Sequence, residues 1–133
     1  MRLELDGTEV VTTTSRWKVP HRVAHMAIAL FDRWELSPEN RAVLLDISEG
    51  ALGHYGESDV ADSSWDRFER IGHLLAIHKN LRLLFPQNRD LRYRWMTTRN
   101  QAFDGQTPVE VVRARGLLGL LTVRAYLDRA RGQ

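Results

Sequence analysis

The residues that could carry out chemistry are few, and the most suggestive are two histidines. His21 and His25 are four positions apart, so on a helix they would lie on one face, where they could hold a metal ion. The residue after His21 is an arginine, where the helix of a zinc hydrolase has a glutamate, and no third ligand lies nearby in the sequence. We therefore expect these histidines to be surface or half-buried residues and predict no metal site.

Nucleophilic catalysis has no better support. The chain has no cysteine, which excludes thiol chemistry and disulfides. Ser63 and Ser64 lie close to Asp66, but no histidine is placed to activate a hydroxyl, so the serines are typical of a helix cap. The glycines are scattered and form no phosphate-binding loop. We predict that the protein is not an enzyme, uses no cofactor and acts by binding another macromolecule.

Arginine dominates the basic residues and is concentrated toward the C-terminus. Residues 1–80 have a net charge of −4, whereas residues 81–133 have a net charge of +6. Guanidinium groups make planar, multi-donor contacts with carboxylates, phosphates and aromatic rings. The C-terminal part could therefore meet nucleic acid, an acidic protein groove or a phosphate-bearing ligand. The alternative is a solvated helix face.

The elements that must position these residues are predicted to be helices, which makes the fold class all-α. Apolar residues recur at helical spacing between capping residues and helix breakers. The predicted helices cover about residues 21–34, 38–47, 48–55, 64–85, 88–96 and 117–130, with a further helix beginning at residue 108.

Two features concern the beginning of the chain and its location. Residues 3–11 alternate around Asp6-Gly7, which predicts a short β-hairpin. The N-terminus lacks the apolar core of a secretory signal, and apolar runs such as residues 117–121 are far shorter than the ~20 residues that span a bilayer. We expect a cytoplasmic protein with no membrane contact.

The most strongly specified helix start is at Thr107. Pro108 occupies the first helical position, and Glu110 stands three residues after the cap. This pattern predicts a capping box, in which the Thr107 hydroxyl and the Glu110 carboxylate each accept a backbone N–H from the other residue.

The preceding stretch, residues 97–106, is predicted to be irregular. Asn100 and Asp104 are expected to bond their own backbone and shape the loop, and Gly105 to supply a positive φ. Phe103 is expected to anchor the loop in the core.

The helices at 38–47 and 48–55, after a longer first helix, have the lengths and the short connection of a helix-turn-helix. A recognition helix normally offers Arg, Lys, Asn or Gln to DNA. In residues 48–55 only Ser48, His54 and Tyr55 could donate, and Glu49 would repel the phosphates. The pattern indicates a helix-turn-helix scaffold with a depleted reading surface.

Two motifs near the C-terminus point to a specific family. Residues 100–110 read Asn-x-x-Phe-x-Gly-x-Thr-Pro-x-Glu, and residues 119–127 read Gly-Leu-x-x-Val-Arg-x-Tyr-Leu. These motifs closely resemble the toxin-binding domain of the Xre/MbcA/ParS antitoxins. Residues 21–80 resemble the Xre-like helix-turn-helix domain of that family more loosely, and the likeness covers about residues 20–133.

The resemblance implies a bacterial type II antitoxin. Such antitoxins pair with RES-domain toxins, and these toxins destroy NAD. The antitoxin covers the entrance of the toxin's active site with its C-terminal region, and it often binds its own promoter. The resemblance also implies a homo- or hetero-oligomer that meets operator DNA as a complex. The expected organisation is an N-terminal arm or hairpin at 1–19, a helix-turn-helix domain at 20–80 and a toxin-binding domain at 81–133.

Within that last domain we expect the toxin to be contacted by a final helix whose end projects from the body. The residues expected to reach the toxin cleft are Arg124, Tyr126, Arg129 and Arg131, with a solvated face as the alternative for the arginines. The leucines of the helix are expected to be core: Leu117, Leu120, Leu121 and Leu127.

Two departures from the family pattern bear on function. Arg99 stands where the family often has a proline before the loop asparagine, so the approach to Asn100 is expected to be less rigid. The depleted segment 48–55 puts autorepression in doubt. Two other functions stay open: a DNA-binding transcriptional regulator, whose affinity would fall steeply with salt, and an orphan helical interaction module without a toxin.

Overall fold

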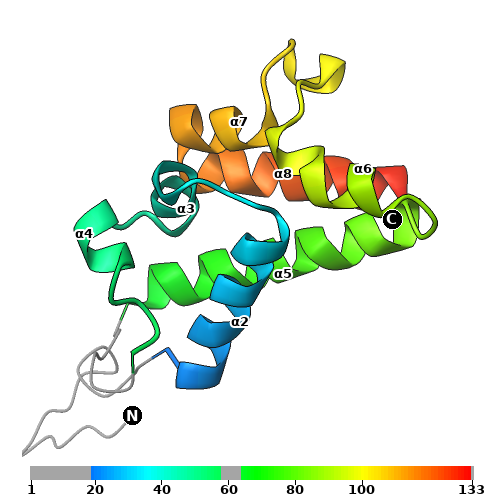
Figure 1. The fold of residues 1–133 in the computed structure, drawn as a ribbon. Helices are drawn as coiled ribbons and strands as arrows, with labels where there is room; N and C mark the ends of the chain where they lie inside the picture. The colour runs from blue at the N-terminus through cyan, green and yellow to red at the C-terminus, as the bar shows by residue number, and fades with distance from the viewer. Residues whose placement is uncertain (1–18, 58–63, 133) are drawn as a thin grey trace, which may run out of the picture.

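The computed structural model describes residues 19–57 and 64–132, in which helices are joined by turns and loops, without a strand. The predicted all-α class is confirmed, and none of the helices described is long and apolar enough to cross a membrane. The β-hairpin predicted at residues 3–11 lies outside the described residues. The α-helices are α2 (His21–Arg33), α3 (Pro38–Leu45), α4 (Glu49–Leu52), α5 (Trp65–Leu84), α6 (Arg89–Arg94), α7 (Pro108–Arg115) and α8 (Leu117–Ala130), with short 3₁₀ helices η1 (Trp95–Thr97) and η2 (Gln101–Phe103) (Figure 1).

Most helices begin where the sequence predicts, because a side chain caps them. The hydroxyls of Ser37, Ser48 and Ser64 accept the backbone N–H groups that open α3, α4 and α5. Each bond satisfies one of the amides that a helix start leaves without an internal partner.

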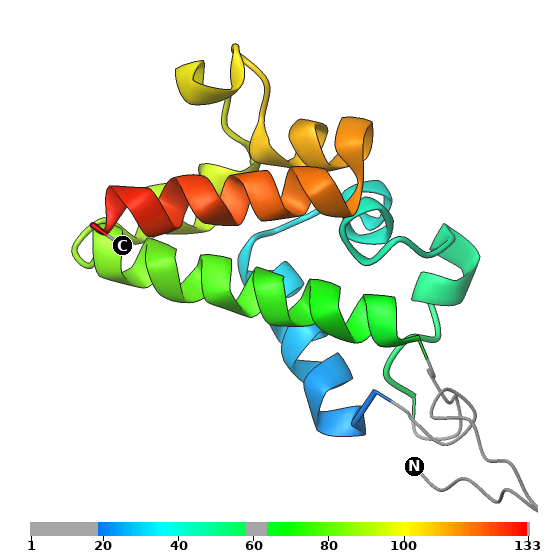
Figure 2. The same ribbon diagram turned by 180° about the vertical axis from the view of Figure 1, so that it is seen from behind.

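The two long helices, α5 and α8, form the centre of the fold. They lie side by side and run in the same direction, as both views show (Figures 1 and 2). Helix α2 crosses α5 from the other side, and α7 packs on the first half of α8. The fully buried residues Phe31, Leu44, Ile77, Leu120 and Leu127 come from both halves of the chain and belong to one continuous hydrophobic cluster. The expected boundary between residues 80 and 81 therefore falls inside α5 and does not separate two cores.

Arg70 connects α5 to α3. The side chain is only 5% exposed, and its Nε donates to the Asp66 carboxylate at 2.9 Å. Asp46 lies 4.0 Å from the guanidinium, and the Leu44 carbonyl accepts a third contact at 3.4 Å. These acceptors compensate the cost of burying a charge, so Arg70 fixes where α3 lies on α5.

The predicted helix over residues 48–55 is wrong in its length. Helix α4 is a single turn that ends at Leu52, and residues 53–56 continue as turns, with Gly56 at a φ of 89°. Three glycines in this stretch lower the helix propensity. A recognition helix of the usual length is therefore not formed here.

The close approach of α7 and α8 depends on glycine. Gly116 joins the two helices at a φ of 62°. A Cβ at Gly119 would overlap the backbone carbonyl oxygen of Val111 and lie 3.0 Å from the Cα of Val112. Any side chain at residue 119 would therefore separate α8 from α7.

Candidate functional site

The predicted capping box is present at the start of α7. Glu110 N–H donates to the Thr107 hydroxyl at 3.1 Å, and Thr107 N–H donates to the Glu110 carboxylate at 2.7 Å. The backbone hydrogen bond from Thr107 holds the pKa of Glu110 below its usual range. Pro108 is buried at the first helical position, so the helix begins at a fixed point.

The loop before α7 is closed by its own backbone. The side-chain oxygen of Asn100 accepts a hydrogen bond from the Ala102 N–H at 2.9 Å. The backbone carbonyl of Asn100 accepts hydrogen bonds from the N–H groups of Phe103 and Gly105, each at 3.0 Å. Asp104 and Gly105 both have positive φ, at 57° and 84°. This agrees with the turn predicted from these residue types, although Asp104 shares the left-handed conformation that we expected of the glycine alone.

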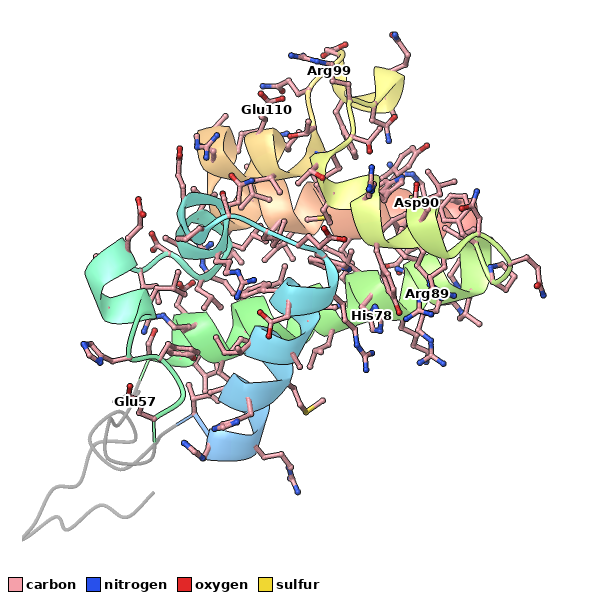
Figure 3. The ribbon with its side chains drawn as sticks, in the orientation of Figure 1. Glu57, His78, Arg89, Asp90, Arg99 and Glu110 are labelled. Carbon is pink, nitrogen blue, oxygen red and sulfur yellow. The ribbon has the colours of Figure 1, made fainter. Side chains whose placement is uncertain are left out.

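Arg99, the residue before the loop asparagine, holds the loop through its side chain. Its guanidinium donates to the Gly105 carbonyl at 3.1 Å, across the base of the loop. Figure 3 shows that Arg99 and Glu110 lie on the same side of the molecule, near the loop that projects beyond α7. The approach to Asn100 is thus held by a side-chain hydrogen bond.

Three aromatic rings pack together at this loop: Phe103 of the loop itself, Trp95 and Tyr126. Phe103 is buried and meets the Tyr126 ring at a centroid distance of 5.3 Å and the Trp95 ring at 6.3 Å, both edge-on. Trp95 and Tyr126 are stacked at 6.2 Å. Tyr126 therefore connects α8 to the loop and is half-buried, with its ring engaged by the protein itself.

Two of the arginines expected to reach a partner are instead engaged between α5 and α8. Asn80 is 1% exposed; it donates to the Asp128 carboxylate at 2.9 Å and accepts from the Arg131 guanidinium at 2.7 Å. Arg124 lies 3.7 Å from Asp128 and contacts His73 at 2.9 Å. We call these five residues the α5–α8 seam.

The seam corrects the expectation that the end of α8 projects. The last turn of α8 is hydrogen-bonded to α5, and Val123 and Leu127 are fully buried. Sequence spacing did not reveal the seam because its polar partners on the two helices are about fifty residues apart.

His73 makes the seam sensitive to pH. Burial and the neighbouring Arg124 guanidinium lower the pKa of His73, which accepts a hydrogen bond from Arg124 only while its ring is neutral. His78, on the α2 side of α5, also has a lowered pKa, because of burial and of nearby arginines. There are therefore pH values at which both imidazole rings are neutral in the folded chain but already protonated in the unfolded chain.

We expect the stability contributed by these rings to be fully present above about pH 6.5, the unfolded value, and to be lost as the pH falls toward the lower folded values, because the unfolded chain binds more protons there. The free energy of unfolding, measured by urea denaturation between about pH 7 and pH 5, should decrease. His73→Gln, which keeps an acceptor for Arg124, should flatten part of that decrease. A variant curve as steep as that of the parent would contradict this assignment.

The face of α8 that points away from the protein carries two leucines. Leu118 is 58% exposed and Leu121 is 39% exposed, and the half-buried Thr122 and Ala125 and the exposed Arg129 continue this face. We call these five residues the outer face of α8. Leu120 and Leu127 are buried as expected and Leu117 is partly buried, but the expectation that Leu121 is core is wrong.

The side chains considered for DNA contact are largely engaged. The Ser48 hydroxyl caps α4, His54 lies 3.4 Å from the Glu57 carboxylate, and Tyr55 is half-buried and lines a cavity of about 390 Å³ beside Leu36 and Leu52. With the one-turn helix α4, this arrangement presents little to a base edge.

His21 and His25 do lie next to each other, with their Nε2 atoms 3.3 Å apart. His25 Nε2 is also 2.9 Å from the carbonyl oxygen of Gly56. Within residues 19–57 and 64–132, no three acidic or histidine side chains are grouped so that they could hold a metal ion.

Comparison with known proteins adds two findings. Residues 80–132 match the antitoxin Xre/MbcA/ParS C-terminal toxin-binding domain. The chain is also 30% identical over 101 residues to the uncharacterised protein y4oB of Sinorhizobium fredii (strain NBRC 101917 / NGR234), and this alignment covers 76% of the chain and 78% of that protein. The domain match begins at the end of α5 and includes the loop, the aromatic rings and all of α8.

Proposed function

The chain belongs to the Xre/MbcA/ParS family of antitoxins, and from this premise we propose that it neutralises a RES-domain, NAD-degrading toxin by covering the entrance of the toxin's active site with its C-terminal region. The toxin-binding domain is what makes a toxin the partner. The identity of that toxin and the manner of inhibition are our proposal.

The observation that carries this proposal is the outer face of α8. Leu118 and Leu121 are large apolar side chains left in solvent on a helix that is otherwise packed on two sides. Interfaces gain most of their affinity from a few side chains that become buried on binding. In our proposal the two leucines are these anchors, and Arg129 contacts the rim of the toxin's cleft.

The other predicted contact residues act indirectly in this proposal. Arg124 and Arg131 hold α8 on α5 through the seam, and Tyr126 holds the loop through its rings. They keep the outer face of α8 rigid, so the interface requires little ordering when it forms. Substituting them should therefore lower folding stability as well as neutralisation.

Direct base readout by α4 is not part of this proposal. The helix is one turn long, and residues 48–57 contain no arginine or lysine that could reach the bases. An autorepressor role would need another surface of this chain or of the toxin complex.

The test is co-expression of the tagged chain with the protein encoded by the adjacent gene, which we expect to be a RES-domain toxin. We expect protected cells, and a complex that survives purification at about 0.5 M salt, because apolar anchoring is little screened by ions. Failure to capture the toxin, or growth arrest despite co-expression, would refute the proposal.

A further inference from the structure

A second surface, formed by α5 and α6 and sharing no residue with the outer face of α8, has a concentration of positive charge. The C-terminal end of α5 and helix α6 enclose an open cavity of about 350 Å³, lined by Lys79, Arg82, Leu83, Pro86 and Arg92. We call it the basic cavity. Two more arginines lie nearby: Arg33, the last residue of α2, is close enough to His78 to act on it electrostatically together with Arg82 and Arg92. Arg89, the first residue of α6, contacts the same Tyr93 ring as Arg92, and Figure 3 shows Arg89 on the same side of the molecule as His78.

The cations of this region are not neutralised by the protein. Among the described residues, no carboxylate lies within ion-pair distance of Arg33, Lys79, Arg82, Arg89 or Arg92. The one acidic residue of α6, Asp90, is paired with Arg94 at 3.1 Å. Like charges gathered without partners repel one another, so a bound anion would stabilise this arrangement.

Two buried polar atoms at the same place also lack a hydrogen-bond partner. They are Nε of Arg92 and Nδ1 of His78. Arginines from three helices, Arg82, Arg33 and Arg92, contribute to lowering the pKa of His78 after burial itself, so their charges converge on one point. The guanidinium of Arg92 is fixed further by the Tyr93 ring, 5.1 Å below it.

We propose that the basic cavity is a binding site for phosphate groups. Guanidinium groups bind phosphate oxygens with two parallel N–H donors, and an ammonium adds a point charge. The lining has three cations and only two apolar residues, which is unlike the apolar core of a protein interface and typical of a surface that binds phosphates. The phosphates could be those of a free nucleotide or of a nucleic-acid backbone.

The experiment uses the full-length chain and two phosphate sources: tripolyphosphate, followed by calorimetry, and a labelled DNA duplex of about 20 base pairs and arbitrary sequence, followed by fluorescence anisotropy. The test variant is Lys79→Ala with Arg82→Ala, both exposed residues of α5. The control is Arg22→Ala with Arg115→Ala, which removes the same charge from exposed positions elsewhere.

At low salt we expect the test variant to lose about tenfold in affinity for each cation removed. For DNA, the slope of log K against the logarithm of the salt concentration should become less negative by about 0.9 for each lost contact. The control should bind like the parent. Stronger binding of tripolyphosphate would assign the site to a nucleotide, and stronger binding of DNA would assign it to a polynucleotide backbone. No binding of either probe, or equal losses in test and control variants, would overturn the proposal.

This inference does not depend on the proposed toxin. The test variant leaves the outer face of α8 intact, so it should still neutralise the toxin. Loss of phosphate binding and loss of neutralisation are therefore separable outcomes.

Discussion

Leu118→Asp combined with Leu121→Asp should abolish toxin neutralisation and leave the antitoxin folded. Both side chains are already in solvent, at 58% and 39% exposure, so a carboxylate there costs the fold little. In a complex the same carboxylates would be buried without partners. Loss of two anchors at about 2 kcal/mol each would weaken the Kd roughly a thousandfold.

The measurement is the Kd for the purified toxin, together with the thermal unfolding midpoint of the antitoxin alone. Met26→Asp is the matched control, because Met26 is 45% exposed on α2, outside the matched toxin-binding domain. It should bind the toxin like the parent. If the double variant unfolds at the parent's temperature and still binds with the parent's Kd, the outer face of α8 is not the interface.

Among the glycines that the structure describes, Gly119 is the one at which alanine should cost the most stability. The new Cβ would overlap the carbonyl oxygen of Val111 and approach the Cα of Val112 at 3.0 Å. Neither atom can yield without moving the backbone of α7, since Val111 and Val112 are themselves buried. We expect a loss of about 3 kcal/mol or more in the free energy of unfolding.

Gly72→Ala is the matched control for that variant. Gly72 also lies within a helix, but a Cβ there would meet nothing within 4 Å. Alanine should stabilise the chain by about 0.5–1 kcal/mol, because glycine is a poor helix former. Urea denaturation of both variants measures the contrast. Equal, small changes at the two positions would show that α7 and α8 do not approach as closely as described.

The sequence predicted the helices well where local signals determine them. Thr107 caps α7 as expected, and Ser64, one of the two serines expected to form a cap, caps α5. Both predictions succeed because a cap depends only on residues within one turn. The sequence overestimated the length of α4, because three glycines in and after this helix lower the helix propensity despite the capping serine. The family resemblance is confirmed by the match of residues 80–132 to the toxin-binding domain of these antitoxins.

The candidate site was less predictable because its geometry depends on distant residues. Helical periodicity does not distinguish an arginine in solvent from one bonded to Asn80 of another helix, as Arg131 is. It also placed Leu121 in the core, although the apolar stripe of α8 is wider than the surface that α5 and α7 cover. The basic cavity was visible in the sequence only as an excess of arginine.

In our proposal, this antitoxin inhibits by covering the entrance to an NAD-degrading active site. The most direct measurement is the rate of NAD consumption by the purified RES-domain toxin as the full-length chain is added. We expect the rate to fall to background when the binding sites are saturated, and we expect no inhibition by the variant that carries both aspartates on α8. NAD consumption that continues unchanged in a complex shown to be fully formed would contradict it.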